Sequence, residues 1–290
     1  MKSITYIIKL FTIMTKFFIY FLMSTLFPYA VISQNNICDS FVFADGVGYD
    51  NNIAKAKAKA INNAKLNALR ISGIEENVNF YSELYKSEIN ENYQELFSTQ
   101  IFLEMRGAVR SVKVLSETKE ILESDIIKCE VRISCEVIKY KTMPDLLYTV
   151  EINGIKPFYY EQELLTFTIK ATKQSWLYVI CIPQNNENAF LVYPNAYEEQ
   201  FHLEANKKYK FPYKVDLFLE TSNGNQQTER LIFVLTKEKI PFVREITYQS
   251  VFDWIVSIPP NQRIVSSYSY SITPLSELRP TYTPPPSQSN

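Results

Sequence analysis

The chain has 290 residues, enough for about two domains, and its 46 % hydrophobic and 21 % charged residues are typical of a globular protein. Its 6 glycines argue against glycine-rich phosphate loops, and a single histidine, His202, excludes most zinc sites and Ser/His/Asp triads. A net charge of −1 offers no basic surface to a nucleic acid. We therefore expect a protein that is not an enzyme and that has no cofactor, no metal site and no nucleic-acid partner.

Residues 1–33 have the order of a secretory signal peptide. They contain three lysines and no acidic residue, and a basic head at 14–16 precedes the apolar run 17–26. The residues before Gln34 are modest in size and suit cleavage there. The sequence therefore predicts an exported bacterial chain, located in the periplasm or at the periphery of the outer membrane.

Two features of this leader stay open. Either Met1 or Met14 can be the start of the chain. The alternative to a cleaved signal is a retained membrane anchor, although the apolar stretch 17–32 is shorter than the ~20 residues that span a bilayer. We expect cleavage, and a mature chain that does not span the membrane.

All four cysteines lie beyond the leader, where export permits disulfides. Cys129 and Cys135 are in phase on one expected strand, about 20 Å apart at ~3.3 Å per residue, so they cannot bridge each other. Cys38 precedes the first strand and could reach either of them. The alternative to a Cys38 disulfide is a set of buried free thiols. Redox catalysis is not expected, because the sequence has no CxxC motif.

The first module, residues 38–140, begins with an expected strand at 40–47 and a helix at 53–71. Asp50 or Asn51 is a suitable N-cap for the helix, and Gly73 is placed to end it. The apolar spacing predicts a buried stripe made of Ala54, Ala58, Ile61, Ala68 and Ile71.

A second helix is expected at 82–105, followed by a hairpin of strands at 109–117 and 125–140. The buried stripe predicted for this helix consists of Tyr85, Ile89, Tyr93, Leu96 and Leu103. The last strand alternates apolar and polar residues, which is typical of a sheet with one face in water. The order β-α-α-β-β indicates a small α+β domain.

A linker at 141–146 leads to a second module, residues 145–275, which reads as strands and turns. The expected strands are 147–152, 164–172, 176–183, 189–193, 207–211, 215–221, 229–236 and 262–272, with one helix at 248–257. This spacing predicts an antiparallel β-sandwich. The fold class is therefore α+β, with a β-α-α-β-β domain followed by a sandwich, and the proline-rich residues 276–290 are expected to be a disordered tail.

Two family resemblances follow from short motifs. The run from Val42 to Gly48 (VFADGVG), the helix with Asn63, Ala64 and Ala68, and Gly107-Ala108-Val109 resemble the N-terminal domain of flagellar assembly protein T, which small outer-membrane lipoproteins share. This resemblance covers residues 38–140, but the chain lacks the lipidated cysteine of those lipoproteins.

The second module resembles an uncharacterised all-β module, domain of unknown function 4384, over residues 145–275. The motifs that carry this resemblance are Trp176–Val179 (WLYV), Phe190–Asn195 (FLVYPN) and Tyr209–Pro212 (YKFP). Together the two resemblances imply an envelope interaction protein with no catalytic residues to carry over.

Two stretches are candidates for partner binding. Pro194 ends a strand and Asn195 favours a turn, so Tyr193-Pro194-Asn195 either defines the fold or displays a binding loop. The aromatic run Phe158-Tyr159-Tyr160 either anchors an interface or caps the core of the sandwich.

Other residues have ordinary structural interpretations. Gly46-Val47-Gly48 is expected to be a turn rather than a dinucleotide site, since the third glycine is missing. Cys181 is expected in the core, apart from His202. The carboxylate pairs, Glu75 with Glu76 and Glu198 with Glu199, and the lysines at 55, 57, 59 and 65 are expected in solvent.

These observations predict an exported, non-catalytic binding and assembly module for other envelope proteins. The alternative is a periplasmic protein that binds a glycan or a small ligand. An exposed aromatic cleft would favour the alternative, whereas an apolar patch or an unpaired edge strand would favour a protein partner.

Overall fold

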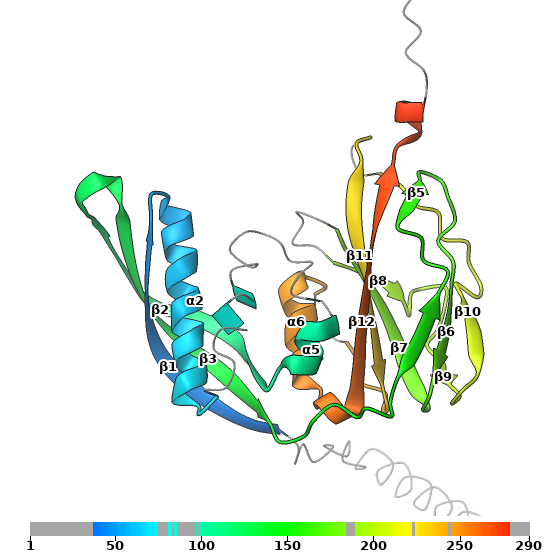
Figure 1. The fold of residues 1–290 in the computed structure, drawn as a ribbon, viewed down its shortest axis with the longest axis horizontal. Coiled ribbons are helices and arrows are strands. Elements are labelled where there is room, and N and C mark those ends of the chain that lie inside the picture. The colour runs from blue at the N-terminus through cyan, green and yellow to red at the C-terminus, as the bar shows by residue number, and fades with distance from the viewer. Residues whose placement is uncertain are drawn as a thin grey trace, which may run out of the picture. The chain divides into compact units, whose positions relative to one another are not determined.

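The computed structural model describes residues 37–74, 81–82, 84–85, 97, 99–183, 189–221, 224–242 and 245–278. Every described residue belongs to one unit, Asn36–Asn290. The predicted signal peptide therefore lies outside the described residues, as does the predicted tail from residue 279 onward. Within this unit the chain has an α+β fold with a β-rich region (Figure 1), as the sequence predicts.

The first sheet has the strand order β1-β3-β2 and is antiparallel throughout. Its strands are β1 (Ile37–Asp50), β2 (Gly107–Ile121) and β3 (Ile127–Tyr140), with a short 3-10 turn, η1 (Glu123–Asp125), in the hairpin. Helix α2 (Ile53–Ile71) lies along one face of this sheet (Figure 1). The predicted strand–helix order and the predicted hairpin are both confirmed.

The second predicted helix is described only in part. Residues 81–82 and 84–85 are helical, but Phe97 lies in a turn and α5 (Thr99–Glu104) is a separate short helix, so one continuous helix over 82–105 is not formed. Tyr85 is buried as predicted, whereas Leu103 is exposed and the neighbouring Phe102 points inward instead. The other three members of the predicted stripe, Ile89, Tyr93 and Leu96, lie outside the described residues.

Both ends of α2 are closed by local hydrogen bonds. At the start, the Asn52 side chain accepts the backbone N–H groups of Ala54 and Lys55, so the N-cap lies one residue beyond the predicted Asn51. At the end, Gly73 adopts φ +72° and the N–H of Ile74 donates to the carbonyl of Leu69. This is a Schellman motif, and it confirms the predicted closing glycine.

The buried stripe of α2 differs from the prediction. Ala54 is exposed and Ile71 is 64 % exposed. Of the predicted members, Ala68 is buried and Ile61 packs partly buried against the core. The buried alanines follow a four-residue spacing: Ala56, Ala60, Ala64 and Ala68.

Two glycines of β1 explain this stripe. A Cβ at Gly46 would lie 2.1 Å from the carbonyl oxygen of Ala60, and a Cβ at Gly48 would lie 2.2 Å from that of Ala56. The helix therefore rests directly on the backbone of the strand at Ala56, Ala60 and Ala64. Gly46-Val47-Gly48 lies inside β1 and is not a turn.

The second region contains two sheets. A three-stranded sheet has the order β10-β6-β4, and a six-stranded sheet has the order β5-β12-β11-β7-β8, with β9 also paired to β7. The strands are β4 (Val150–Asn153), β5 (Phe158–Tyr160), β6 (Phe167–Ala171), β7 (Ser175–Pro183), β8 (Phe190–Tyr193), β9 (His202–Leu203), β10 (Lys208–Phe211), β11 (Gln227–Thr236) and β12 (Arg263–Thr273). All pairs are antiparallel except β5 with β12.

Some predicted strands differ from the observed ones. The predicted strand at 215–221 is an irregular segment, joined to 163–165 by a single bridge between Leu164 and Phe218 and by flanking hydrogen bonds. The short strands β5 and β9 were not predicted, because two or three residues are too few for an alternation to show. The start of the predicted tail, residues 276–278, belongs to a 3-10 turn, η3 (Leu275–Leu278).

The six-stranded sheet is buried on both faces. One face of β7, with Leu177 and Val179, packs toward the three-stranded sheet. The other face, with Tyr178 and Ile180, joins a core that includes helix α6 (Tyr248–Ser257) and the first sheet. Burial on both sides explains why the central strands are apolar without alternation. Helix α6 has the predicted bounds.

Direct bonds also join the first sheet to the second region. The Tyr140 hydroxyl at the end of β3 donates to the carbonyl of Val256 at 2.7 Å, and Thr142 bonds to Asn261 at 3.1 Å. The Asn261 side chain belongs to the 3-10 turn η2 (Pro260–Gln262) that precedes β12. Within the described residues, no helix is long and apolar enough to cross a membrane.

Candidate binding site

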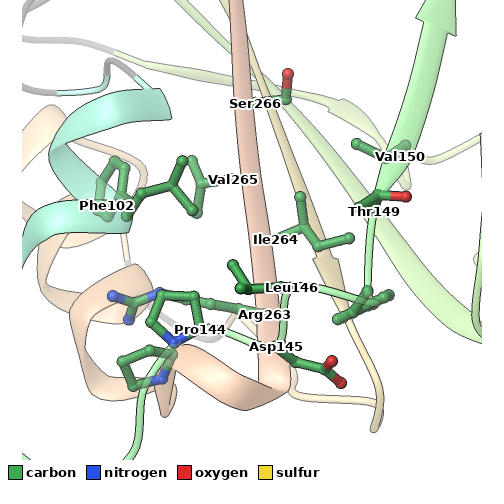
Figure 2. Close-up of a pocket in the computed structure, with 13 residues that line it drawn as sticks. Phe102, Pro144, Asp145, Leu146, Thr149, Val150, Arg263, Ile264, Val265 and Ser266 are labelled. Carbon is green, nitrogen blue, oxygen red and sulfur yellow. The ribbon is translucent and has the colours of Figure 1, made fainter.

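A pocket of about 300 Å³ lies where α5, the segment 144–150 and the start of β12 meet (Figure 2). Its lining is mainly apolar and consists of Phe102, Leu103, Pro144, Asp145, Leu146, Tyr148, Thr149, Val150, Pro260, Arg263, Ile264, Val265 and Ser266. Three separate stretches of chain thus form one concave surface. Pockets of this size and character bind apolar groups.

The segment 144–150 is held in place by Asp145. Its carboxylate forms ion pairs with Lys173, at 2.6 Å, and with Lys237, at 2.7 Å, and accepts the N–H of Leu147 at 3.1 Å. The hydrogen bonds from the two lysines hold the pKa of Asp145 well below its usual range. Asp145 is therefore a fixed, neutralised anchor rather than an acid or a base.

Arg263 forms the opposite end of the lining. Its guanidinium lies between the rings of Phe102 and Tyr140, 5.5 and 5.2 Å from their centroids, and donates to the carbonyls of Ile255 and Ile258 at the end of α6. Figure 2 shows Arg263 reaching under Phe102, on the side of the pocket away from Asp145. This arginine holds α6, α5 and β12 together, so the wall of the pocket is built on rigid elements.

The rim of the pocket carries exposed apolar side chains. Leu146 is 85 % exposed, Leu103 is about half exposed, and Met143 and Leu147 beside them are also exposed. Isolated exposed leucines are ordinary, but a cluster of them next to an apolar pocket marks an interaction surface. The chemistry available here is the binding of apolar side chains.

Sequence reasoning missed this site. Its only signal was the stretch Met143-Pro144-Asp145-Leu146-Leu147, where a linker carries three large apolar residues. Polar residues are expected in a solvated linker, so such a stretch indicates a contact surface.

Tyr193-Pro194-Asn195 holds the fold together. Tyr193 is 1 % exposed, and its hydroxyl accepts the N–H of Phe201 at 3.1 Å and donates to the carbonyl of Glu199 at 3.2 Å. The Asn195 side chain accepts the N–H of Glu198 at 2.9 Å and donates to the carbonyl of Val192 at 2.8 Å. Of the two interpretations left open, these contacts favour fold definition.

The three aromatic residues of β5 do not share one role. Tyr159 is buried, with its ring 5.4 Å from that of Tyr270, and so caps the core. Phe158 and Tyr160 point the other way and are exposed. Only these two remain available to a partner, and they lie beside the end of β12.

Cys129 and Cys135 are buried free thiols on β3. The register of β1 places Cys38 opposite Lys139, four residues along β3 from Cys135, which is about 13 Å at ~3.3 Å per residue. A disulfide requires Cα atoms within about 7 Å, so the strand pairing itself separates Cys38 from both partners that we considered. Neither bridge is formed.

Cys181 and His202 are not brought together. The thiol donates to the Glu229 carboxylate at 3.2 Å, and burial is the main cause that raises the pKa of Cys181 well above its usual value. His202 pairs with Trp176, five residues away along β7, and its ring lies 5.2 Å from that of Trp176. A thiol and an imidazole placed in this way cannot act as nucleophile and base.

The lysines expected in solvent differ in exposure. Lys57 and Lys59 are partly exposed and form ion pairs at 2.7 Å with Glu117 and Asp50. Lys65 is buried with its ammonium 5.0 Å from the centre of the Tyr85 ring, which corrects its expected solvation.

The two carboxylates of the pair Glu198-Glu199 also differ in exposure. Glu199 is exposed, but Glu198 is fully buried, which corrects its expected solvation. Glu75 and Glu76 lie outside the described residues. Among the residues that the structure describes, no group of three or more His, Cys, Asp or Glu side chains is placed to hold a metal ion.

Comparison with known proteins bears on the second region. No family model matches residues 38–140, so the resemblance to flagellar assembly protein T has no support from a family match. No curated protein matches the chain. Every residue that lines the pocket lies outside residues 159–239, which comprise β6 to β11 and most of β5. Residues 159–239 match the family described as Domain of unknown function (DUF4384), in agreement with the all-β resemblance.

Proposed function

We propose that the chain is an exported bacterial cell-envelope protein that binds other envelope proteins without catalysis, and that a partner docks at the pocket beside β12. Export is supported by the lysines and the apolar run of residues 1–33. The resemblance of residues 38–140 to the flagellar assembly protein T domain supports an assembly role for the first domain. The β-rich region then presents the partner's docking surface.

The observation that carries the proposal is the apolar pocket with its exposed rim. Burying a side chain such as Leu146 against a partner would contribute about 1.5–3 kcal/mol. Glycan sites, by contrast, rely on exposed aromatic rings, and the two rings in this lining, Phe102 and Tyr148, are both buried. The pocket therefore favours an apolar protein segment over a sugar.

Site-specific crosslinking in the native host tests this proposal. A photoreactive benzoylphenylalanine would replace Leu146 on the rim in the full-length chain. In a matched control it would replace Ile121, which is 75 % exposed at the tip of the β2–β3 hairpin, away from the pocket.

We expect a discrete adduct with one envelope protein from position 146 and none from position 121. Leu146→Asp should remove the same partner from a co-purified complex, because a carboxylate would have to be desolvated at the interface. Equal adducts from both positions, or a monomer free of adducts in every envelope fraction, would contradict the proposal.

A further inference from the structure

Three lysines lie on the outer face of the three-stranded sheet. Along β4, β6 and β10, alternate residues face solvent and the residues between them pack toward the core. Figure 1 shows β6 and β10 on the side of the six-stranded sheet away from α6. The outward side chains of the three strands are Glu151, Asn153, Thr168, Lys170, Lys208 and Lys210. This face therefore carries three positive charges and one negative charge.

Two of these lysines are placed against each other. The register of β6 and β10 sets Lys208 directly opposite Lys170, and like charges in such positions destabilise a sheet. Glu151 lies opposite Lys170 on β4, but its carboxylate accepts a hydrogen bond from the Asn153 amide at 2.9 Å. Within the part of the chain that the structure describes, Lys170, Lys208 and Lys210 form no ion pair. Their charges are therefore uncompensated in the free chain.

The Asp145 end of the pocket also has positive charge in excess. The single carboxylate of Asp145 is shared by the ammonium groups of Lys173 and Lys237, whose side chains remain 40 % and 26 % exposed. Lys173 lies just after β6, three residues from Lys170. Around Asp145 and on the outer face of the sheet, five lysines thus accompany two carboxylates, whereas the whole chain has a net charge of −1. This part of the molecule is therefore locally basic.

The pocket and the lysine face are neighbours. Val150 lines the pocket and begins β4, and the next residue, Glu151, lies opposite Lys170 of β6. Adjacent strands are about 4.8 Å apart, so Lys170 lies one strand and Lys208 two strands from this wall of the pocket. An extended chain covers ~3.3 Å per residue. A segment with an apolar anchor in the pocket would therefore bring its next few residues over the lysines.

We propose that the protein segment that docks at the pocket is acidic beside its apolar anchor, and that its carboxylates bind Lys170, Lys208 and Lys210. This inference rests on the proposed function and specifies the chemistry of the partner segment. A carboxylate between Lys170 and Lys208 would replace the repulsion of their ammonium groups by two attractions. An ammonium group is a point charge with rotatable donors, so three lysines on a flat face can bind carboxylates without a fixed geometry.

Crosslinking from position 146 in the native host tests the inference on the full chain. Benzoylphenylalanine in place of Leu146 is combined with Lys208→Glu/Lys210→Glu, or with Lys55→Glu/Lys113→Glu as the matched control. The control lysines are exposed, belong to the first domain, and change the net charge by the same amount when reversed. Mass spectrometry of the adduct then identifies the segment of the partner that carries the crosslink.

We expect Lys208→Glu/Lys210→Glu to lower the yield of the adduct about fivefold or more, because two attractions become repulsions, although each exposed ion pair alone contributes little. The control pair should leave the yield unchanged. Lys208→Arg/Lys210→Arg should also leave it unchanged, since both positive charges are retained. The captured segment should contain Asp or Glu within about five residues of the crosslinked position, the reach of an extended chain over the sheet.

The outcomes separate the two proposals. Equal yields from the two charge-reversed variants, or a captured segment without acidic residues, would overturn the inference and leave docking at the pocket to stand. No adduct from position 146 in the otherwise wild-type chain would contradict the proposed function, and the inference would fail with it.

The stability of the charge-reversed variant provides a second test. Lys208→Glu replaces the repulsion between Lys170 and Lys208 by a favourable cross-strand pair. We therefore expect the urea midpoint of Lys208→Glu/Lys210→Glu to equal or exceed that of wild type, so that a lower adduct yield reports on binding. A midpoint below that of wild type would contradict the repulsion on which the inference depends.

Discussion

The carboxylate of Glu198 accepts the backbone N–H of Tyr213 at 2.6 Å, and a second bond joins the same oxygen to the N–H of Lys214. This fully buried side chain ties the turn after β8 to the turn after β10. The FLVYPN and YKFP motifs precede these two turns. Glu198, which belongs to neither motif, therefore connects the segments that follow FLVYPN and YKFP, two of the motifs on which the all-β resemblance is based.

Replacing this carboxylate should destabilise the β-rich region. Glu198→Gln keeps the shape of the side chain but weakens two charge-assisted bonds and buries an amide, so we expect a loss of about 1–3 kcal/mol in the free energy of unfolding. Glu199→Gln, an exposed neighbour, should change it by less than about 0.5 kcal/mol. Urea unfolding of both variants checks this, and equal midpoints would show that the buried bonds contribute nothing.

The contact between α2 and β1 leaves no space for a methyl group at Gly46. Gly46→Ala would force a Cβ to 2.1 Å from the Ala60 carbonyl oxygen, and because the obstacle is backbone, the helix must shift. We expect a loss of about 3 kcal/mol, at the upper end of overpacking costs. The adjacent Val47→Ala should cost about 1 kcal/mol or less, since that side chain is on the opposite face. Thermal unfolding compares the two, and a Gly46→Ala protein as stable as wild type would contradict the packing.

The anchor of segment 144–150 should make stability depend on pH. Lys173 and Lys237 lower the pKa of Asp145 in the folded state. The ionised carboxylate therefore stabilises the fold above the unfolded pKa of about 3.9, and this stabilisation is lost as the pH falls toward the lower folded pKa. Asp145→Asn should therefore be less stable than wild type at pH 7, and the difference should narrow at pH 3. Urea midpoints of both proteins at the two pH values measure this difference in stability. A difference that is larger at pH 3 than at pH 7 would contradict the prediction.

The cysteines should behave as buried thiols. Burial raises the pKa of Cys135 to about 11 and also raises that of Cys129, so little thiolate forms at pH 8. We expect the folded chain to react slowly with a thiol reagent, and at least three thiols to react in urea without reductant, namely those of Cys129, Cys135 and Cys181. Fewer than three in urea would indicate a disulfide.

The sequence predicted those elements whose bounds and buried faces depend on residues close in the chain. Helix α6 has its predicted bounds because an apolar run follows the capping pair Thr247 and Ser250. The alternation of β3 predicted which face is buried. The stripe predicted for α2 was wrong at Ala54 and Ile71, because alanine is only weakly apolar and the choice between faces depends on Gly46 and Gly48 of another strand.

The binding site could not be predicted in the same way. Its walls come from Phe102, from the segment 144–150 and from residues 260–266, which are brought together only by the pairing of β12 with β11 and by Arg263. Tyr193 is a simpler case: the turn signal was compatible with fold definition or with a displayed loop, and the tyrosine ring lies in the core.

Site-specific crosslinking from the rim of the pocket tests the central claim most directly. We predict a discrete adduct with one envelope protein when the photoreactive residue replaces Leu146, and none when it replaces Ile121 at the tip of the β2–β3 hairpin. Equal adducts from both positions, or no adduct from position 146 in any envelope fraction, would contradict a partner site at the pocket.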